Sequence, residues 1–243
     1  MNDTPKIPWG ILSTGHIAGR FAEARNTLPA AELVAVGSRD QKTADTFASS
    51  YGCDRAHGSY EALAADPDID IIYIGTPHAF HLENATLCMR AGKAVLCEKA
   101  FTINASEARE MVALAREEGV FLMEAMIPRC VPLMKEVMGW VQSGRIGELR
   151  MVKASRCARG TFDPKGRHMN PELGGGSLLD VGVYVVSFAY QCFGRMPVET
   201  TGVVHIGPLG SDEQGVALLK YDHGEIANLT FALQTEAVNE AYL

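Results

Sequence analysis

The chain has 243 residues, of which 47% are hydrophobic and 21% are charged, and its formal net charge is −7. This length and composition are typical of a soluble globular protein with one large domain or two modest ones. The acidic balance argues against nucleic acid or an anionic membrane as a partner, although a local field can still hold an anionic cofactor.

The N-terminal segment, Met1 to Pro8, is polar and lacks the apolar core of a signal peptide. The six cysteines include no C-x-x-C pair. This pattern favours free buried thiols in a reducing compartment over a disulfide framework or a metal site. We therefore expect a cytoplasmic protein.

The first apolar run, Trp9 to Ala18, predicts a short buried strand, a tight turn of small residues and the start of a helix. Such a turn lets the N–H groups of a helix N-terminus bind the pyrophosphate of a dinucleotide. The usual pattern is G-x-G-x-x-G/A, and here those positions hold Ser13, Gly15 and Ala18. Because serine departs from the pattern, a plain strand-to-helix connection stays open. The expected cofactor contacts in this turn are Ser13, Thr14, Gly15, His16 and Ile17.

Strands and helices then alternate through the first half of the chain. Further strands are expected at residues 33–36, 69–74, 94–97 and 120–123, with helices at 17–25, up to Tyr51, at 60–65, at 78–91 and from an Asn104 cap to Glu118. Nearly continuous apolar strands separated by helices predict right-handed crossovers and a doubly wound parallel sheet. We assign residues 1–124 to this Rossmann domain.

The pattern changes near Glu124. A helix is expected at 131–142, a strand at 149–158, a polar loop at 159–176, a helix at 177–193, and strands at 199–206, 215–221 and 225–233. Asp222-His-Gly224 predicts a hairpin turn, and strands joined by hairpins indicate an antiparallel sheet in a second domain, residues 125–243. The helix at 177–193 is strongly apolar, but it carries Asp180 and is short for a membrane span, so we interpret it as buried.

The end of the second strand bears on the choice of cofactor. A site for NAD has an acidic side chain there to bind the ribose 2′-OH. Ser38 and Arg39 stand at this place, with Asp40 one position later. A hydroxyl and a guanidinium suit a 2′-phosphate, so NADP is favoured and NAD stays possible. The alternative is that Arg39 is a solvated loop residue.

Polar residues also follow the third strand, at the edge of the sheet where ligands bind. The segment is Gly75-Thr76-Pro77-His78, with His81 three residues further on. Two histidines at this spacing can share a metal, but no third ligand is near. We therefore expect no metal, and we expect Thr76, Pro77, His78 and His81 to cap the helix or contact the cofactor.

Glu98 and Lys99 directly follow the fourth strand at the same edge. A lysine there can bind a substrate oxygen or lower the pKa of a neighbouring acid. We expect both residues to contact the cofactor, and the alternative is a surface ion pair.

Asp180 and Tyr184 lie four residues apart in the apolar helix and so share one face. A buried carboxylate and phenol need polar partners. The phenol, whose pKa is normally about 10, can exchange a proton near neutrality beside a cation. A core tyrosine bonded to an aspartate is the simpler alternative.

Together these segments resemble the Gfo/Idh/MocA oxidoreductases, and within them the branch of dimeric trans-dihydrodiol dehydrogenase and NADP-dependent D-xylose dehydrogenase. The matching pieces are residues 9–18, 73–78, 98–104, 123–126, Arg129 and residues 171–184. The family's Glu-Lys-Pro is Glu-Lys-Ala here, and Ala100 loosens the turn but keeps the lysine. Family members usually continue through more strands than this chain, so we expect a smaller second sheet with an exposed edge. Either a partner chain covers that edge, or the chain is shortened.

The resemblance implies a Rossmann domain followed by an open, mostly antiparallel α+β domain that binds substrate and forms a homodimer or higher oligomer. Lys99 and Tyr184 would form the acid–base pair with support from Asp180, and Arg129 and Arg167 would line the substrate site beside them. The implied reaction transfers a hydride between NADP and a secondary alcohol of a sugar, cyclic polyol or dihydrodiol. A non-catalytic NAD(P)-binding sensor or regulator of the same fold is the alternative.

Overall fold

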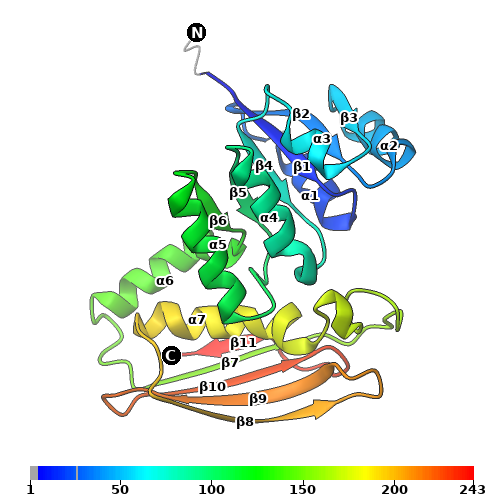
Figure 1. The fold of residues 1–243 in the computed structure, drawn as a ribbon. Helices are drawn as coiled ribbons and strands as arrows, with labels where there is room; N and C mark the ends of the chain where they lie inside the picture. The colour runs from blue at the N-terminus through cyan, green and yellow to red at the C-terminus, as the bar shows by residue number, and fades with distance from the viewer. Residues whose placement is uncertain (1–4, 26) are drawn as a thin grey trace. The chain divides into compact units, whose positions relative to one another are not determined.

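The structure is a computed structural model that describes residues 5–25 and 27–243. The first four residues of the polar segment Met1 to Pro8 lie outside the described residues. Contacts divide the chain into two compact units, residues 1–125 and residues 126–243 (Figure 1). Each unit contains its own sheet and its own hydrophobic core.

The first unit is built on a six-stranded parallel sheet with the order β3-β2-β1-β4-β5-β6. The strands are β1 (Ile7–Leu12), β2 (Ala31–Gly37), β3 (Arg55–His57), β4 (Ile71–Ile74), β5 (Ala94–Cys97) and β6 (Leu122–Glu124). Because the chain runs outward from β1 in both directions, the carboxyl ends of β1 and β4 flank the point where such sheets bind dinucleotides. The predicted Rossmann sheet is confirmed. Its short edge strand β3 was not predicted, because it holds no apolar run.

Helices cover both faces of this sheet. They are α1 (His16–Arg25), α2 (Gln41–Tyr51), α3 (Tyr60–Ala64), α4 (His81–Arg90) and α5 (Ala105–Glu117), with a 3₁₀ turn η1 (His78–Phe80) before α4. Ile11 and Leu12 are both fully buried and point to opposite faces of β1. Leu12 packs in a core with Met89 and Met111, whereas Ile11 packs in a second core with Phe47. Burial on both faces explains the nearly continuous apolar strands.

Side-chain caps fix where two of these helices begin. The Asp40 carboxylate accepts a hydrogen bond from the Thr43 N–H at the start of α2. Asn104 accepts one from the Glu107 N–H at the start of α5, as predicted, and its amide donates to the Glu107 carboxylate at 2.9 Å. Gly52 closes α2 with φ +69, a conformation that glycine adopts without a steric penalty.

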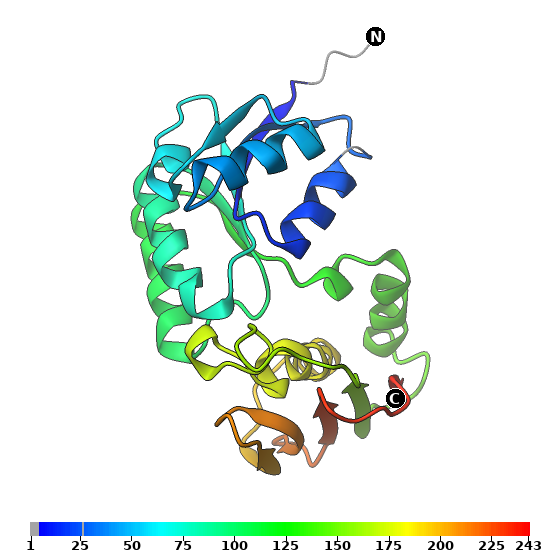
Figure 2. The ribbon, with the colours of Figure 1, turned by 90° about the vertical axis from the view of Figure 1, so that its right-hand side faces the viewer.

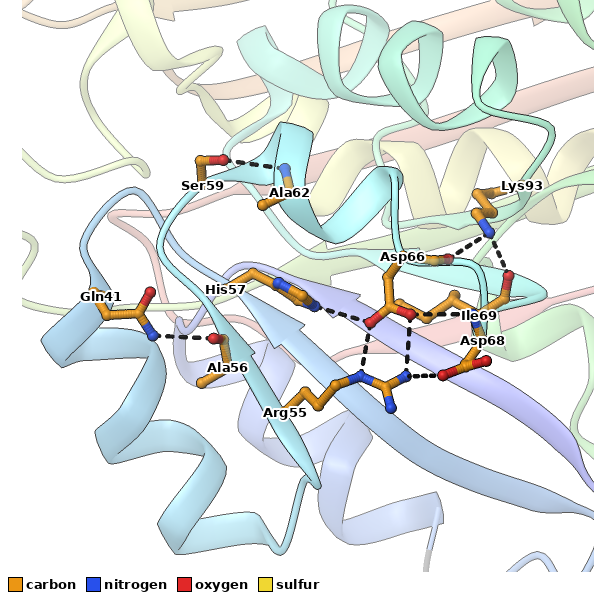
Figure 3. A network of polar contacts seen from close by, with 10 residues as sticks. All are labelled: Gln41, Arg55, Ala56, His57, Ser59, Ala62, Asp66, Asp68, Ile69 and Lys93. Atoms are coloured by element: carbon orange, nitrogen blue, oxygen red, sulfur yellow. Dashed lines mark hydrogen bonds and ion pairs between the residues drawn. The ribbon is translucent and has the colours of Figure 1, made fainter.

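A polar network fastens the edge strand β3 to the loop that follows α3 (Figure 3). The buried Asp66 carboxylate accepts hydrogen bonds from Arg55 at 2.9 and 3.0 Å and lies 2.9 Å from His57 Nε2. The Lys93 ammonium donates to the carbonyls of Asp66 and Ile69, each at 2.7 Å. Burial opposes ionisation of Asp66, but the hydrogen bonds from Arg55 and His57 hold its pKa below the ordinary value. The network therefore replaces the apolar packing that β3 lacks.

The second unit is built on a five-stranded sheet with the order β11-β7-β10-β9-β8. The strands are β7 (Met151–Cys157), β8 (Glu199–Ile206), β9 (Asp212–Lys220), β10 (Ile226–Ala232) and β11 (Glu240–Tyr242). Among the described strands of this second sheet, only β7 and β10 pair in parallel, so the mostly antiparallel sheet is confirmed. The predicted hairpin closes through a hydrogen bond from the Tyr221 N–H to the Glu225 carbonyl, with Gly224 at φ +91. Strand β11 was not predicted.

One face of this sheet is covered by helix α7 (Val183–Phe193), as Figure 1 and Figure 2 show. Val185 and Ala189 of α7 pack in one core with Leu229 and Phe231 of β10. The other helical segments of this unit are η2 (Ile127–Arg129), α6 (Pro132–Gln142), η3 (Pro171–Leu173) and η4 (Leu178–Gly182). The predicted helix at 177–193 is confirmed, and its first turn, η4, is π-helical.

By length and composition alone, the segment Pro171–Phe193 is apolar enough to cross a membrane. Half of its most apolar stretch is buried inside the protein. The buried side chains of α7 form part of the core of the second unit, which is the arrangement expected for a core helix.

Candidate active site

The turn between β1 and α1 leaves space where a dinucleotide fold binds phosphates. A Cβ placed on Gly15 would meet no atom within 4 Å. The residues beside the turn and the facing residues of α2 line a cavity of about 420 Å³: Thr14, Gly15, His16, Lys42, Thr43, Thr46, Phe47, Ser50 and Tyr51. An anion bound here would face the positive end of α1. The turn therefore fits the pyrophosphate of a dinucleotide.

Ser13 stands in place of the first glycine of the pattern and keeps the glycine conformation. Its φ is +125, in the region that side-chain-bearing residues rarely adopt. Its Oγ is buried without a hydrogen-bond partner among the described residues. A Cβ on Gly75 would lie 3.1 Å from this Oγ, so the two loops approach closely. A strained residue with an orphaned hydroxyl at this turn is consistent with a ligand site.

The residues after β2 divide between structure and binding. The Ser38 N–H donates to the His57 carbonyl at 3.0 Å, which fixes Ser38 at the edge of the sheet. Hydrogen bonds from Thr43 hold the pKa of Asp40 below its usual value, and this carboxylate serves as the cap of α2. Arg39 is exposed. Lys42, which sequence reasoning missed, lines the cavity beside the phosphate turn, and its place in the first turn after Arg39 was the available signal.

His81 lies between two loops of the candidate cofactor site. The ring is fully buried. Its Nδ1 lies 2.8 Å from the Ala100 carbonyl and 3.2 Å from the Phe101 carbonyl, and its Nε2 lies 2.9 Å from the Thr76 carbonyl. Burial lowers the pKa of His81, although these carbonyl contacts favour the charged ring. His81 therefore ties the segment after Lys99 to the Thr76 turn, and its contact with the cofactor stays a prediction.

Further hydrogen bonds fix the turn at Thr76 and Pro77. The Asn84 amide donates to the Thr76 hydroxyl at 3.0 Å. Pro77 precedes η1, and the buried His78 Nε2 lies 3.1 Å from the Lys99 carbonyl. The peptide bond between Lys99 and Ala100 is cis.

Glu98 is anchored from inside the unit. Its carboxylate accepts a hydrogen bond from the Tyr73 hydroxyl at 2.7 Å and another from the Lys99 N–H at 3.1 Å. Burial and the Glu98 carboxylate raise the pKa of Tyr73, whose ring stacks on Phe21 with centroids 4.0 Å apart. Because Glu98 is buried, the alternative of a surface ion pair does not describe it. Lys99 is half-buried and follows directly after this anchor.

Histidines and cysteines form no metal-like cluster in the part of the chain that the structure describes. The rings of His78 and His81 lie edge to face with centroids 5.7 Å apart. All six cysteines are free, and Cys88, Cys97 and Cys157 are buried as expected. Cys130 is exposed, which the sequence did not predict.

In the second unit, Asp180 lies in the π-helical turn η4 and Tyr184 lies in the first turn of α7. The buried Asp180 carboxylate accepts a hydrogen bond from Arg167 at 2.9 Å. The guanidinium of Arg156 lies 5.7 Å from the centre of the Tyr184 ring. Sequence reasoning missed Arg156, although its even spacing from the buried Val152 along β7 placed it on the side of the sheet that α7 covers. π-Helical turns are frequent at functional sites.

Asp212 at the start of β9 fixes the beginning of η4. Its Oδ2 accepts hydrogen bonds from the Ser177 hydroxyl at 2.6 Å and from the Leu178 N–H at 2.7 Å. Gly176 has φ +129, and a Cβ there would collide with the Asp212 carboxylate. The position of Asp180 is therefore set by a carboxylate far along the chain. The expected start of the strand at residue 215 missed this anchor.

Arg129 also reaches α7. Its Nε donates to the Ser187 hydroxyl at 3.0 Å, and its guanidinium lies 5.8 Å from the centre of the Tyr190 ring. Asp180, Tyr184 and Ser187 follow the i, i+4, i+7 spacing of one helical stripe. The structure therefore brings the expected substrate residues of the second unit to one stripe, and the expected cofactor residues of the first unit to one edge of the parallel sheet.

Two family models match the sequence. Residues 7–126 match the oxidoreductase family with an NAD-binding Rossmann fold, and residues 134–241 match the GFO/IDH/MocA C-terminal domain. Curated relatives include trans-1,2-dihydrobenzene-1,2-diol dehydrogenases. The protein from Mus musculus is 40% identical over 240 residues, which are 98% of this chain and 72% of that protein. The protein from Danio rerio is 39% identical over 98% of this chain and 71% of its own length.

Solved structures show the same fold. KijD10, a 3-ketoreductase from Actinomadura kijaniata in complex with NADP and TDP-benzene, aligns with a TM-score of 0.87 and 31% identity over 97% of this chain and 73% of that chain. An aldose-aldose oxidoreductase from Caulobacter crescentus, complexed with glycerol, aligns with a TM-score of 0.88 and 27% identity over 95% and 72%.

Proposed function

Because the chain belongs to the Gfo/Idh/MocA oxidoreductase family, we propose that it is an NADP-dependent dehydrogenase of a secondary alcohol on a sugar, cyclic polyol or dihydrodiol. Similar proteins named as diol dehydrogenases, a 3-ketoreductase and an aldose-aldose oxidoreductase support this substrate class. The observation that carries the proposal is the edge of the parallel sheet, where the open Gly15 turn, Arg39 and Lys99 follow three of its strands.

The cofactor would be held by residues 1–124. Thr14, Gly15, His16 and Ile17 would bind the pyrophosphate at the start of α1, with the Ser13 hydroxyl beside them. Ser38, Arg39 and Lys42 would bind the 2′-phosphate, which supports NADP. Thr76, Pro77, His78, Glu98 and Lys99 follow β4 and β5 and would complete the site, with His81 behind them. When bound, the nicotinamide supplies the acceptor and donor of the hydride.

The proposed acid–base residues are Tyr184 and Lys99. Tyr184 takes the hydroxyl proton as the alcohol is oxidised and returns it in the reverse reaction, assisted by Lys99. The Asp180 carboxylate, which pairs with Arg167, would also accept a hydrogen bond from a substrate hydroxyl. Arg129 and Arg167 line the substrate side of the same helical stripe.

Replacing Tyr184 by phenylalanine tests this assignment. We expect Tyr184→Phe to lower turnover by roughly two to four orders of magnitude, because it removes only the proton-transferring oxygen. NADP affinity, measured by fluorescence, should stay within about twofold. Tyr242→Phe is the matched control, since that hydroxyl bonds to Glu240 on β11. Unchanged turnover in Tyr184→Phe would contradict the proposed role. NADP binding without NADPH formation on any sugar, polyol or dihydrodiol would favour the sensor.

We also propose a homodimer or higher homo-oligomer in the cytoplasm, assembled through the open face of the second sheet. Val216 and Leu218 of β9 point away from α7 and are exposed, and β8 is exposed along its whole length. The free cysteines support a reducing compartment. The double variant Val216→Lys, Leu218→Lys should reduce the mass measured by light scattering to that of one chain. A wild-type protein that is already monomeric at high concentration would overturn the assembly.

A further inference from the structure

Three arginines gather along one stripe of the helical segment that carries Asp180 and Tyr184. We call Arg129, Arg156 and Arg167 the arginine face. Arg167 contacts Asp180, Arg156 lies over Tyr184, and Arg129 contacts Ser187. They come from η2, from β7 and from the loop before η3, so the fold and not local sequence brings them together.

The charges on this face do not balance. Asp180 is the carboxylate paired with Arg167. Within the described residues of the second unit, Arg129 and Arg156 form no ion pair with a carboxylate, and both are exposed. Elsewhere in this unit, Arg150 pairs with Glu148, and Arg195 pairs with Asp222 and Glu225. An excess of positive charge beside the expected catalytic residues stands out in a chain whose net charge is −7.

We propose that the substrate is an alcohol that also carries an anionic group, a carboxylate or a phosphate ester, bound by the arginine face. The inference rests on the proposed function, since it concerns the substrate of the same site. A guanidinium offers paired N–H donors that match a carboxylate or phosphate in plane and charge. The neutral hydroxyl reacts at Tyr184, and the anionic substituent of the same molecule neutralises the arginines.

Arg156 determines this specificity. Arg167 is already bonded to Asp180, and Arg129 already donates to Ser187, whereas the described contact of Arg156 is with the face of a ring. A cation over an aromatic ring keeps its N–H donors for a second partner at the edge of the guanidinium. Arg156 therefore has the donors to bind the anion next to the reacting hydroxyl.

Three pyranoses that differ only at C6 test the proposal: D-glucose, D-glucuronate and D-glucose 6-phosphate. NADPH formation gives kcat and KM for each sugar, and calorimetry on the NADP-saturated protein gives affinity without turnover. For the wild type, we expect the affinity and kcat/KM for glucuronate or glucose 6-phosphate to be about 10- to 100-fold higher than those for glucose. The two anionic sugars distinguish a carboxylate site from a phosphate site. High salt should weaken binding of the anionic sugar and leave the affinity for glucose unchanged.

Arg156→Gln should abolish this preference, because the affinity and kcat/KM for the anionic sugar should fall about 10- to 100-fold further than those for glucose. Arg156→Lys should restore part of it, because it returns the charge without the planar fork. Arg150→Gln is the control for loss of an exposed arginine. Equal affinity for the three sugars, or no effect of Arg156→Gln, would overturn the inference. If only neutral sugars are turned over, the anion-binding inference is overturned and the proposed dehydrogenase activity is kept. Arg156-dependent binding of an anionic sugar without NADPH formation would support the anion site and overturn the dehydrogenase.

Discussion

Replacing His81 by alanine should destabilise the first unit and disturb the cofactor site together. The wild-type ring lies within 2.9 Å of the Ala100 and Thr76 carbonyls and is fully buried. The carbonyl that loses its N–H donor without access to water costs about 1–3 kcal/mol. The cavity left by the ring adds a further penalty. We therefore expect His81→Ala to lower the free energy of unfolding by about 4 kcal/mol.

Urea unfolding of the wild type and His81→Ala measures this difference. His223→Ala makes the same chemical change at an exposed site of the second unit and should stay within about 0.5 kcal/mol of the wild type. His81→Asn keeps one donor and should recover part of the loss. Because the ring holds the chain after Lys99, we also expect a lower kcat in conditions where His81→Ala is fully folded. A loss below about 1 kcal/mol, with unchanged kcat, would refute the reasoning.

Three further changes follow from the first unit. Arg39→Gln should raise the KM for NADP at least about tenfold and leave that for NAD within about twofold, because only NADP carries the 2′-phosphate; equal effects on both would contradict the assignment. Ser13→Gly should raise the free energy of unfolding by about 1 kcal/mol, because glycine adopts φ +125 without a steric penalty, and it should stabilise more than Ser13→Ala, which keeps the Cβ. Asp66→Asn should lower the free energy of unfolding by about 3 kcal/mol at neutral pH, because Arg55 loses its buried partner. The pKa of Asp66 is lowered in the folded chain, so its contribution is complete above the unfolded pKa of about 4 and is lost as the pH falls through the folded pKa. Acid denaturation should therefore bring the wild type and Asp66→Asn together, and a difference that persists at low pH would contradict this origin.

Apolar runs predicted most of the fold, because strands buried on both faces leave a continuous signal in the sequence. The runs ending at Leu12 and Ile74 became β1 and β4, with the polar turns of the candidate site directly after them. β3 escaped prediction because Asp66, a residue outside the strand, supplies the contacts that hold it. β11 escaped for a similar reason, since its three residues are ordered by pairing with distant β7.

The candidate site was predictable where function follows from strand ends, and less so where it depends on three-dimensional packing. Ser38, Arg39 and Lys99 follow predicted strands, so their common edge could be inferred. The buried place of His81 between two carbonyl-lined turns could not, because a histidine three residues from another looks the same in a binding site. Arg156 is an intermediate case: its spacing from Val152 predicts the side of the sheet that α7 covers, whereas its place over the Tyr184 ring depends on how α7 packs.

The Asp212 anchor has a consequence for how the protein is made. Asp212 leaves the ribosome after Asp180 and α7, so the apolar side of α7 can begin to pack before the carboxylate that caps η4 has been synthesised. The segment around Asp180 then becomes fully ordered only after β9 has paired within the sheet. Hydrogen exchange at the Leu178 amide during refolding would time that event. In nascent chains that end before residue 212, the start of this helix would lack its cap.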